Sequence, residues 1–152
     1  MMLTGRIFRE STGWSAHCEI VGIYTQGRSL KEATANLAEA IELKAGRDGL
    51  AVSVSDLGAI ADDSHTVFID SNDPALLAAE VLKYQREKNN LSLSDVAKRL
   101  GASSLNAYAA YEQGARKPSL GKFRELLAVV APDMVLSVGP RGGAKRKTKT
   151  AR

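Results

Sequence analysis

The sequence has few of the features that mark secreted, membrane or metal-binding proteins. Its 152 residues include one cysteine, Cys18, so no disulfide can form within the chain and no cysteine-rich metal site can be built. No apolar run approaches the roughly 20 residues that a membrane-spanning helix needs. The first residues also lack the basic and apolar segments of a signal peptide. We therefore expect a cytoplasmic protein with no membrane partner.

Charge is unevenly distributed along the chain. Residues 1–72 hold six basic and ten acidic side chains, a net charge of −4, whereas residues 73–140 hold nine and seven, a net charge of +2. Residues 141–152 hold six basic side chains and no acidic one. An acidic first half favours a basic partner, and a basic second half favours phosphate. The basic tail either is a solvated, disordered extension or adds sequence-independent affinity for DNA.

The first half predicts strands around one helix. Residues 3–9 and 14–21 predict two paired strands. One face of the second strand collects its apolar and small side chains: Trp14, Ala16, Cys18 and Ile20. Two more β-prone runs lie at residues 51–54 and 66–69, and the segment between them has no clear preference.

The helix of the first half is marked at both ends. Ser29 is a good N-cap, and Glu32 follows at the spacing of a capping box. Gly46 is suited to end the helix in a left-handed conformation. An apolar stripe recurs at helical spacing between them: Ala33, Leu37, Ala40 and Ile41.

Residues 14–43, WSAHCEIVGIYTQGRSLKEATANLAEAIEL, resemble the N-terminal domain of HicB-type antitoxins. That family has a strand, a Thr-Gln-Gly turn and then a patterned helix, which this chain matches at Thr25-Gln26-Gly27, Leu30, Glu32-Ala33, Asn36-Leu37 and Glu39-Ala40-Ile41. The resemblance implies a small β-sheet with one packed helix, a partial relative of the ribonuclease H fold. It also implies a partner, a small basic HicA-type toxin that cleaves mRNA and is neutralised by binding.

The resemblance leads to a predicted contact surface for the toxin. We choose four residues because they lie on or beside the strand face opposite the predicted helix: His17, Glu19, Tyr24 and Gln26. A competing interpretation is an active ribonuclease H-type enzyme, which needs several carboxylates converging on divalent metal ions. The acids available for it are Glu10, Glu19, Asp56, Asp62, Asp63 and Asp70. Their spacing does not force convergence, so we expect no catalytic residue, no metal and no cofactor.

The second half predicts a series of helices. Four residues are suited to cap the starts of these helices: Asp73, Ser92, Ser103 and Ser119. Pro74 at the first helical position supports the first start, and Asp95 pairs with Ser92 as a capping box. The breaks between helices are marked by Asn89-Asn90, Gly101 and Pro118.

This series resembles the helix-turn-helix module of repressors of the lambda and Cro class. The family's Tyr-Glu-x-Gly ending and its following proline are matched by Tyr111-Glu112, Gly114 and Pro118. The third helix would then enter the DNA major groove, with Leu105, Tyr108 and Tyr111 facing inward. From Gly101 to Gly114 the chain is one residue longer than that family usually is, which leaves two registers open for the outward residues.

The predicted DNA contacts follow from that placement. They are Ser94, Ser103, Ser104, Asn106, Ala107, Ala110, Arg116 and Lys117. Asn106 can bond adenine through two hydrogen bonds, and the alanines can touch a thymine methyl. Arg116 and Lys117 are placed to meet phosphates. The alternative is a helical bundle that never touches DNA and serves dimerisation.

Together these patterns predict an α+β chain. It consists of a toxin-binding domain at residues 1–72, an all-α helix-turn-helix domain at 73–138 and a basic tail at 139–152. Residues 135–138 are open to a short terminal strand that could pair across a dimer. The predicted function is an antitoxin that represses its own operon by binding operator DNA as a homodimer or higher even oligomer. The alternative is a solitary helix-turn-helix repressor whose first domain oligomerises or senses a ligand.

Overall fold

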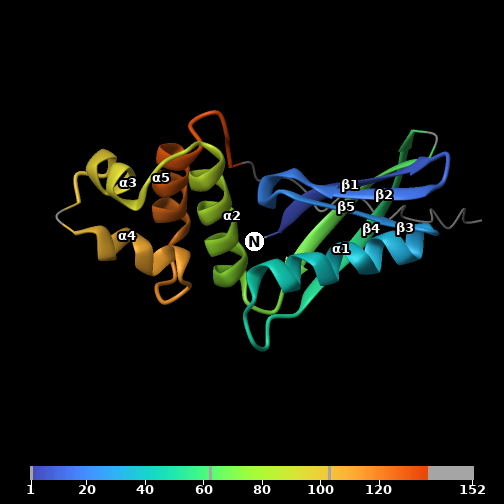
Figure 1. Ribbon diagram of the computed structural model, residues 1–152, viewed down its shortest axis with the longest axis horizontal. Helices are drawn as coiled ribbons and strands as arrows, with labels where there is room; N and C mark the ends of the chain where they lie inside the picture. Colours follow the sequence, from blue (N-terminus) through green and yellow to red (C-terminus); the bar gives the residue numbers. More distant parts are fainter. Residues whose placement is uncertain (1, 62, 103, 137–152) are drawn as a thin grey trace, which may run out of the picture.

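The computed structural model describes residues 2–61, 63–102 and 104–136. Five strands form one sheet in the order β3-β2-β1-β5-β4, and all neighbouring strands are antiparallel. The strands are β1 (Leu3–Glu10), β2 (Gly13–Cys18), β3 (Ile23–Gly27), β4 (Val52–Ala61) and β5 (Ser64–Ser71). Together with α1 (Leu30–Ala45) they make up the sheet unit, residues 3–71. Figure 1 shows α1 lying along one side of this sheet.

The chain between β2 and β3 departs from the sequence prediction. The expected second strand ends at Cys18, and Glu19–Val21 forms the 3-10 helix η1. Gly22 then adopts a left-handed conformation with φ of 63°, which a residue without a Cβ tolerates. The turn expected at Thr25-Gln26-Gly27 is instead part of an edge strand. It forms because β2 offers a pairing partner, which local sequence cannot reveal.

The β4–β5 hairpin is longer than predicted. The expected strands at 51–54 and 66–69 extend to Ala61 and start at Ser64, and the pairing register shifts twice, between Asp56 and Ala59 and again before Ala61. Bulges of this kind interrupt the alternation of side chains. The segment between the two β-prone runs, which had no clear preference in the sequence, therefore belongs to these strands, but its side chains do not alternate regularly.

The predicted caps of α1 are confirmed. The Ser29 hydroxyl accepts a hydrogen bond from the Glu32 N–H at 3.1 Å, and Gly46 ends the helix with φ of 56°. The Glu32 carboxylate accepts from the N–H of Arg28 at 2.8 Å, one residue before the expected partner. The buried stripe of Ala33, Leu37 and Ile41 packs on the sheet.

The two faces of the sheet differ sharply. The face toward α1 is buried and apolar, with Ile7, Ala16, Cys18 and Val67 at 0% exposure. Strand alternation sends the neighbouring side chains to the other face. We call that other side the open face: it carries Arg6, Phe8, Ser15, His17, Tyr24, Gln26 and Phe68. Arg6, Tyr24 and Gln26 are exposed, the three other rings are half-buried, and Ser15 is buried.

Four helices form the helical unit, residues 74–130: α2 (Pro74–Lys88), α3 (Leu93–Arg99), α4 (Leu105–Glu112) and α5 (Leu120–Val130). Asp73, Ser92 and Ser119 are N-caps as predicted. The start of α4 is one residue later than predicted, because Ser104 is its cap. Ser103 lies outside the described residues.

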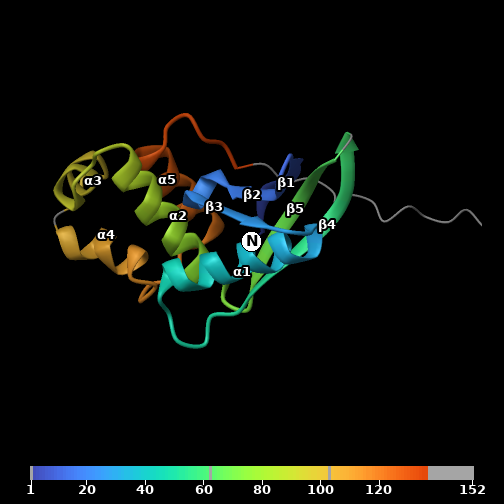
Figure 2. The same ribbon diagram turned by 45° about the vertical axis from the view of Figure 1, so that its right-hand side comes forward.

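Helix α2 joins the two units. Its residues Leu77, Val81 and Leu82 are fully buried and belong to one apolar cluster that includes residues of both units. The Gln85 amide nitrogen donates to the carbonyl of Ile20 at 2.9 Å, and the ammonium of Lys44 lies 4.3 Å from the Tyr84 ring centroid. Figures 1 and 2 both show α2 between the sheet unit and the α3–α4 end.

Several predicted positions are wrong. Leu105 and Leu120, expected to pack inward, are 47% and 71% exposed, and Leu126 is buried instead. Val135 and Leu136 do not form the expected strand, and residues 137–152, which include the predicted basic tail, lie outside the described residues. No helix in the described part of the chain is long and apolar enough to cross a membrane.

Candidate functional site

Helices α3 and α4 form the end of the molecule farthest from the β4–β5 hairpin (Figures 1 and 2). Gly101, with φ of 63°, lies in the turn between them. Helix α3 is tightly capped, since the Ser92 hydroxyl and the Asp95 carboxylate each accept from the other residue's N–H group. The Ser92 hydroxyl also donates to the Asp95 carboxylate at 2.6 Å. This bond, followed by the one from the Ser92 N–H, lowers the pKa of Asp95. The turn geometry is therefore set locally.

A buried ion pair positions α4. The Arg86 guanidinium donates from Nε to Glu112 Oε1 at 2.7 Å and from Nη2 to Oε2 at 3.0 Å. It also donates to the carbonyl of Leu91 at 2.9 Å. The side chains of Arg86 and Glu112 are 14% and 7% exposed. The hydrogen bond to Glu112 raises the pKa of Arg86. A bidentate pair has one favoured geometry, so it fixes the orientation of α4 against α2.

Tyr108 anchors the inner face of α4. It is 1% exposed, and burial together with the nearby Glu112 carboxylate raises the pKa of its phenol. The phenol therefore stays neutral at physiological pH. Tyr111, which the sequence also placed inward, is half-buried.

The opposite face of α4 is accessible. Asn106 and Ala107 are exposed, whereas Ala110 is half-buried, and Ser94 is exposed in the first turn of α3. The Ser104 hydroxyl accepts from the Asn106 N–H at 3.2 Å, so it serves the helix start. The structure thus brings Ser104, Asn106 and Ala107 together in the first turn of one short helix.

The two basic residues after α4 point to different places. Arg116 is exposed, and its guanidinium carbon lies 5.6 Å from the Tyr111 ring centroid, beside α4. Lys117 pairs with Asp73 at 3.8 Å, near the start of α2. The Lys117 side chain is 74% exposed, so this pair is weak. Sequence reasoning grouped the two residues, but only Arg116 lies next to the accessible helix.

Leu105 is a surface residue that sequence reasoning missed. It is the first residue of α4 and nearly half exposed, next to Asn106. An apolar side chain there can touch a thymine methyl. It was missed because α4 begins one residue later than predicted, which leaves Leu105 at the exposed start of the helix, while Tyr108 keeps its inward position.

The open face of the sheet carries a second distinctive set of residues. The rings of Phe8, His17 and Tyr24 form an edge-to-face row across β1, β2 and β3, with centroid distances of 4.9 and 4.8 Å. We call these three residues the aromatic row; Tyr24 is 61% exposed. Of the four predicted toxin contacts, His17, Tyr24 and Gln26 share this face, and Glu19 lies in η1 beyond the end of β2.

Phe8 was not among the predicted contacts, although the alternation of side chains along β1 indicates the face on which it lies. Its neighbour Ile7 is buried against α1, so Phe8 must face the other way.

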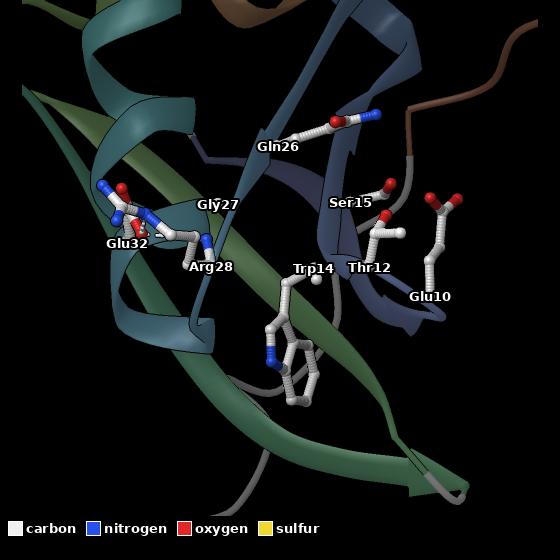
Figure 3. A pocket seen from close by; sticks show the side chains of 9 residues that line it. Glu10, Thr12, Trp14, Ser15, Gln26, Gly27, Arg28 and Glu32 are labelled. Carbon is white, nitrogen blue, oxygen red and sulfur yellow. Dashed lines mark hydrogen bonds and ion pairs between the residues drawn. The ribbon is translucent and has the colours of Figure 1, made fainter.

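A shallow hollow of about 250 Å³ is lined by Ser15 and Gln26, which are next to His17 and Tyr24 on the open face. In Figure 3 the side chains of Ser15, Gln26 and Glu10 lie on one side of the strands, and the indole of Trp14 lies on the other. Arg28 and Glu32 close the hollow at the start of α1, where the Glu32 carboxylate already accepts the Arg28 N–H. The hollow thus extends the open face to the edge of the sheet.

The acids considered for metal chemistry are dispersed. Both oxygens of Asp56 lie within 3.0 Å of His65 Nδ1, and Asp63 is 3.9 Å from Arg9. Asp62 lies outside the described residues. Within residues 2–61, 63–102 and 104–136, no three histidine, cysteine or acidic side chains are grouped so that they could hold a metal ion. Burial raises the pKa of Cys18 to about 11, so its thiol stays protonated in the core.

Comparison with known protein families identifies the helical unit. Residues 82–130 match the family model for helix-turn-helix domains. The match runs from the second half of α2 to the end of α5 and includes the accessible face of α4. It supports DNA binding and transcription regulation. No curated protein and no solved structure matches the chain.

Proposed function

We propose that the chain is an antitoxin that neutralises a small basic mRNA-cleaving toxin and represses its own operon. The observation that carries this proposal is the union, in one chain, of a helix-turn-helix domain and a small sheet with an unburied aromatic row. In the proposal the chain acts by blocking: it covers the toxin's active site and it covers the promoter. Neither activity requires catalysis. The likeness to ribonuclease H and the cytoplasmic location belong to the same proposal.

Charge supports a basic partner for the sheet unit. Residues 1–72 carry a net charge of −4, and the acids Glu10 and Glu19 are exposed at opposite ends of β2. Long-range attraction of this kind speeds the encounter with a cationic protein. Arg6 is a basic residue of the open face, opposite His17. The attraction therefore comes from the acidic surroundings of the aromatic row.

The aromatic row supports a direct contact. A lysine or arginine side chain placed over an aromatic ring is attracted by the negative face of that ring. Tyr24 is the most exposed member of the row, and the exposed Gln26 follows it on the same face. These contacts are the means by which a cationic toxin would be held after it arrives.

The helix-turn-helix domain supplies the second activity in this proposal. Asn106 would read an adenine, Ala107 and Leu105 would touch methyl groups, and Arg116 would meet a phosphate. A helix of eight residues whose exposed first turn offers one short polar side chain, Asn106, gives modest readout. We therefore expect two copies on an inverted repeat and an affinity that falls steeply with salt.

Co-expression tests the toxin role. The full chain is produced with the product of the adjacent short open reading frame and captured from the lysate. A stable complex that restores growth supports the antitoxin function. A double variant, His17→Ala with Tyr24→Ala, should lose the complex, whereas Ser53→Ala on β4, away from the row, should keep it. If the wild type captures no toxin but still binds its own promoter, the chain is a solitary repressor.

Salt-matched titrations on promoter DNA test the second activity. Asn106→Ala should weaken binding by about 1–3 kcal/mol, as expected for loss of a base contact. Arg116→Ala should lower the slope of log affinity against log salt by about 1. Gln113→Ala, at the exposed end of α4, is the control. Unchanged binding by Asn106→Ala would show that α4 is not the recognition helix.

A further inference from the structure

An apolar groove lies where the end of the sheet meets α2 and α5. Its volume is about 920 Å³. Its floor is formed by apolar side chains from β5, α2 and α5: Phe68, Ala78, Val81, Phe123 and Leu127. None of its lining residues, as far as the chain is described, comes from α3 or α4. The groove therefore lies apart from α4 and from the aromatic row, and neither proposed contact uses it.

The rim of the groove exposes large apolar side chains. Leu120 is 71% exposed, Val135 86% and Leu136 38%, and all three line the groove. Single exposed apolar residues are ordinary on protein surfaces, but several around one hollow mark a site of association. The groove can therefore accept apolar side chains of a partner, and the residues of its rim can pack on the partner's surface.

The position of the groove favours a second copy of the chain as occupant. Readout by a helix-turn-helix domain normally requires two copies with both recognition helices facing DNA. In Figure 1, α2 and α5 stand between the sheet unit and the α3–α4 end. A copy seated on the sheet side of α5 leaves α4 accessible in both subunits.

Charge at the rim also fits self-association. Among the described residues, those that line the groove and carry charge are Asp73 and Lys117, 3.8 Å apart. In a two-fold interface a residue i that meets j is repeated by j meeting i. A patch with one acid and one base can thus pair with itself, whereas a patch of one sign would repel its copy. The described charges of the groove are balanced, so they would not attract a cationic toxin.

We infer that a second copy of this chain occupies the groove in a symmetric dimer, with Leu120 and Val135 of each copy covering the groove of the other. The inference deepens the proposed operator binding, on which it rests, by locating the surface that sets the spacing of the two recognition helices. It also separates the dimer contacts from the aromatic row proposed for the toxin.

Sedimentation of the full chain tests the interface. The wild type should sediment as a dimer at micromolar concentration. Leu120→Glu should raise the dimer dissociation constant by at least about 30-fold, the effect of losing a central interface residue. Leu43→Glu is the matched control, because Leu43 is 73% exposed on α1 and outside the groove. Both residues are exposed in the single chain, so thermal unfolding should show both variants folded.

Val135→Glu provides a second variant outside the helices. It should weaken the dimer as Leu120→Glu does. The inference is overturned if the wild type is monomeric at concentrations that bind promoter DNA, or if both groove variants remain as dimeric as Leu43→Glu. It is also overturned if Leu120→Glu abolishes toxin capture and leaves the dimer intact, because the groove would then hold the toxin.

The same samples separate this inference from the proposed function. A wild-type dimer that the groove variants dissociate, in a chain that captures no toxin, keeps the interface and removes the antitoxin role. A monomer that still captures toxin removes the interface and keeps the antitoxin role.

Discussion

The sheet unit and the helical unit hold their exposed surfaces in place by different means. In the sheet unit, main-chain pairing between β1, β2 and β3 positions the aromatic row, and the core behind it is apolar. In the helical unit, α4 has eight residues and no ladder of its own. Its orientation depends on the buried Arg86–Glu112 pair and on Tyr108. A short helix that must meet a rigid ligand needs such directional contacts, because apolar packing alone permits several orientations.

The two units also depend on each other through α2. Leu77 and Val81 of α2 lie in the same apolar cluster as residues of the sheet. Gln85 and Tyr84 of α2 contact the η1 turn, through Ile20 and Gly22. The two units therefore have separate exposed surfaces but one common core. The following substitutions test which contacts belong to each unit and which belong to both.

The largest effects are expected from cavities on the two sides of the shared core. Leu37→Ala under the sheet and Leu126→Ala in α5 each remove a fully buried side chain and should lower the free energy of unfolding by about 3–4 kcal/mol. Because the core is continuous, each variant should unfold in one transition. Trp14 fluorescence reports the sheet unit, and far-ultraviolet circular dichroism reports mainly the helices. Two separated midpoints in Leu126→Ala would show that the units unfold independently.

The next largest effect is expected from loss of the Arg86–Glu112 ion pair, a contact that belongs to the helical unit and not to the sheet unit. Arg86→Leu leaves the Glu112 carboxylate buried without its partner and should destabilise the chain by about 3 kcal/mol. Promoter binding should weaken by more than instability explains, because α4 loses its fixed orientation. Arg124→Leu, at an exposed position of α5, is the control in urea titrations. Equal stability of the two variants would mean that the pair does not hold α4.

Gly22→Ala tests the junction between the units. A Cβ at Gly22 would lie 2.2 Å from the Tyr84 ring, and φ there is 63°, so both strain and a clash oppose it. We expect a loss of about 2–3 kcal/mol. Gly49→Ala shares the positive φ, at 78°, but meets nothing within 4 Å and should lose about 1 kcal/mol. Equal losses in thermal unfolding would show that the contact with Tyr84 carries no energy.

The smallest effect is expected at Glu80, a buried acid of α2. Burial raises its pKa, against the attraction of Lys83, Arg47 and Lys44. The folded chain therefore holds this proton to a higher pH than the unfolded chain does. Stability must then fall as pH rises from the ordinary pKa of 4.5 through the raised one.

Glu80→Gln removes that ionisation. The variant should be more stable than the wild type at pH 7, by less than about 1 kcal/mol, and the difference should vanish below pH 4.5. Paired urea titrations at the two pH values measure it. A gain that persists in acid would assign the effect to packing.

Local signals predicted the helices well. The caps at Ser29, Asp73, Ser92 and Ser119 are confirmed, since a cap depends on residues within one helical turn. The open face of the sheet was also predicted for His17, because strand alternation is a local property; Tyr24 lies in β3, a strand that the sequence did not predict. The match of residues 82–130 confirms the helix-turn-helix module read from the Tyr-Glu-x-Gly ending.

Distant contacts were not predictable in the same way. Strand β3 forms only because β2 pairs with it, and the Arg86–Glu112 pair joins residues 26 positions apart. The pattern of α5 placed Leu120 in the core, but it lies on the rim of a groove whose other wall comes from the sheet.

The amino-acid sequence alone determined where this chain becomes helical, which strand faces are apolar and which half carries acidic charge, because each follows from neighbouring residues. Only the tertiary structure decided that α2 joins both units in one core, that three rings from three strands form one row, and that an apolar groove opens beside α5. These features depend on residues far apart in the chain, and their free energy exists only once the elements have packed together.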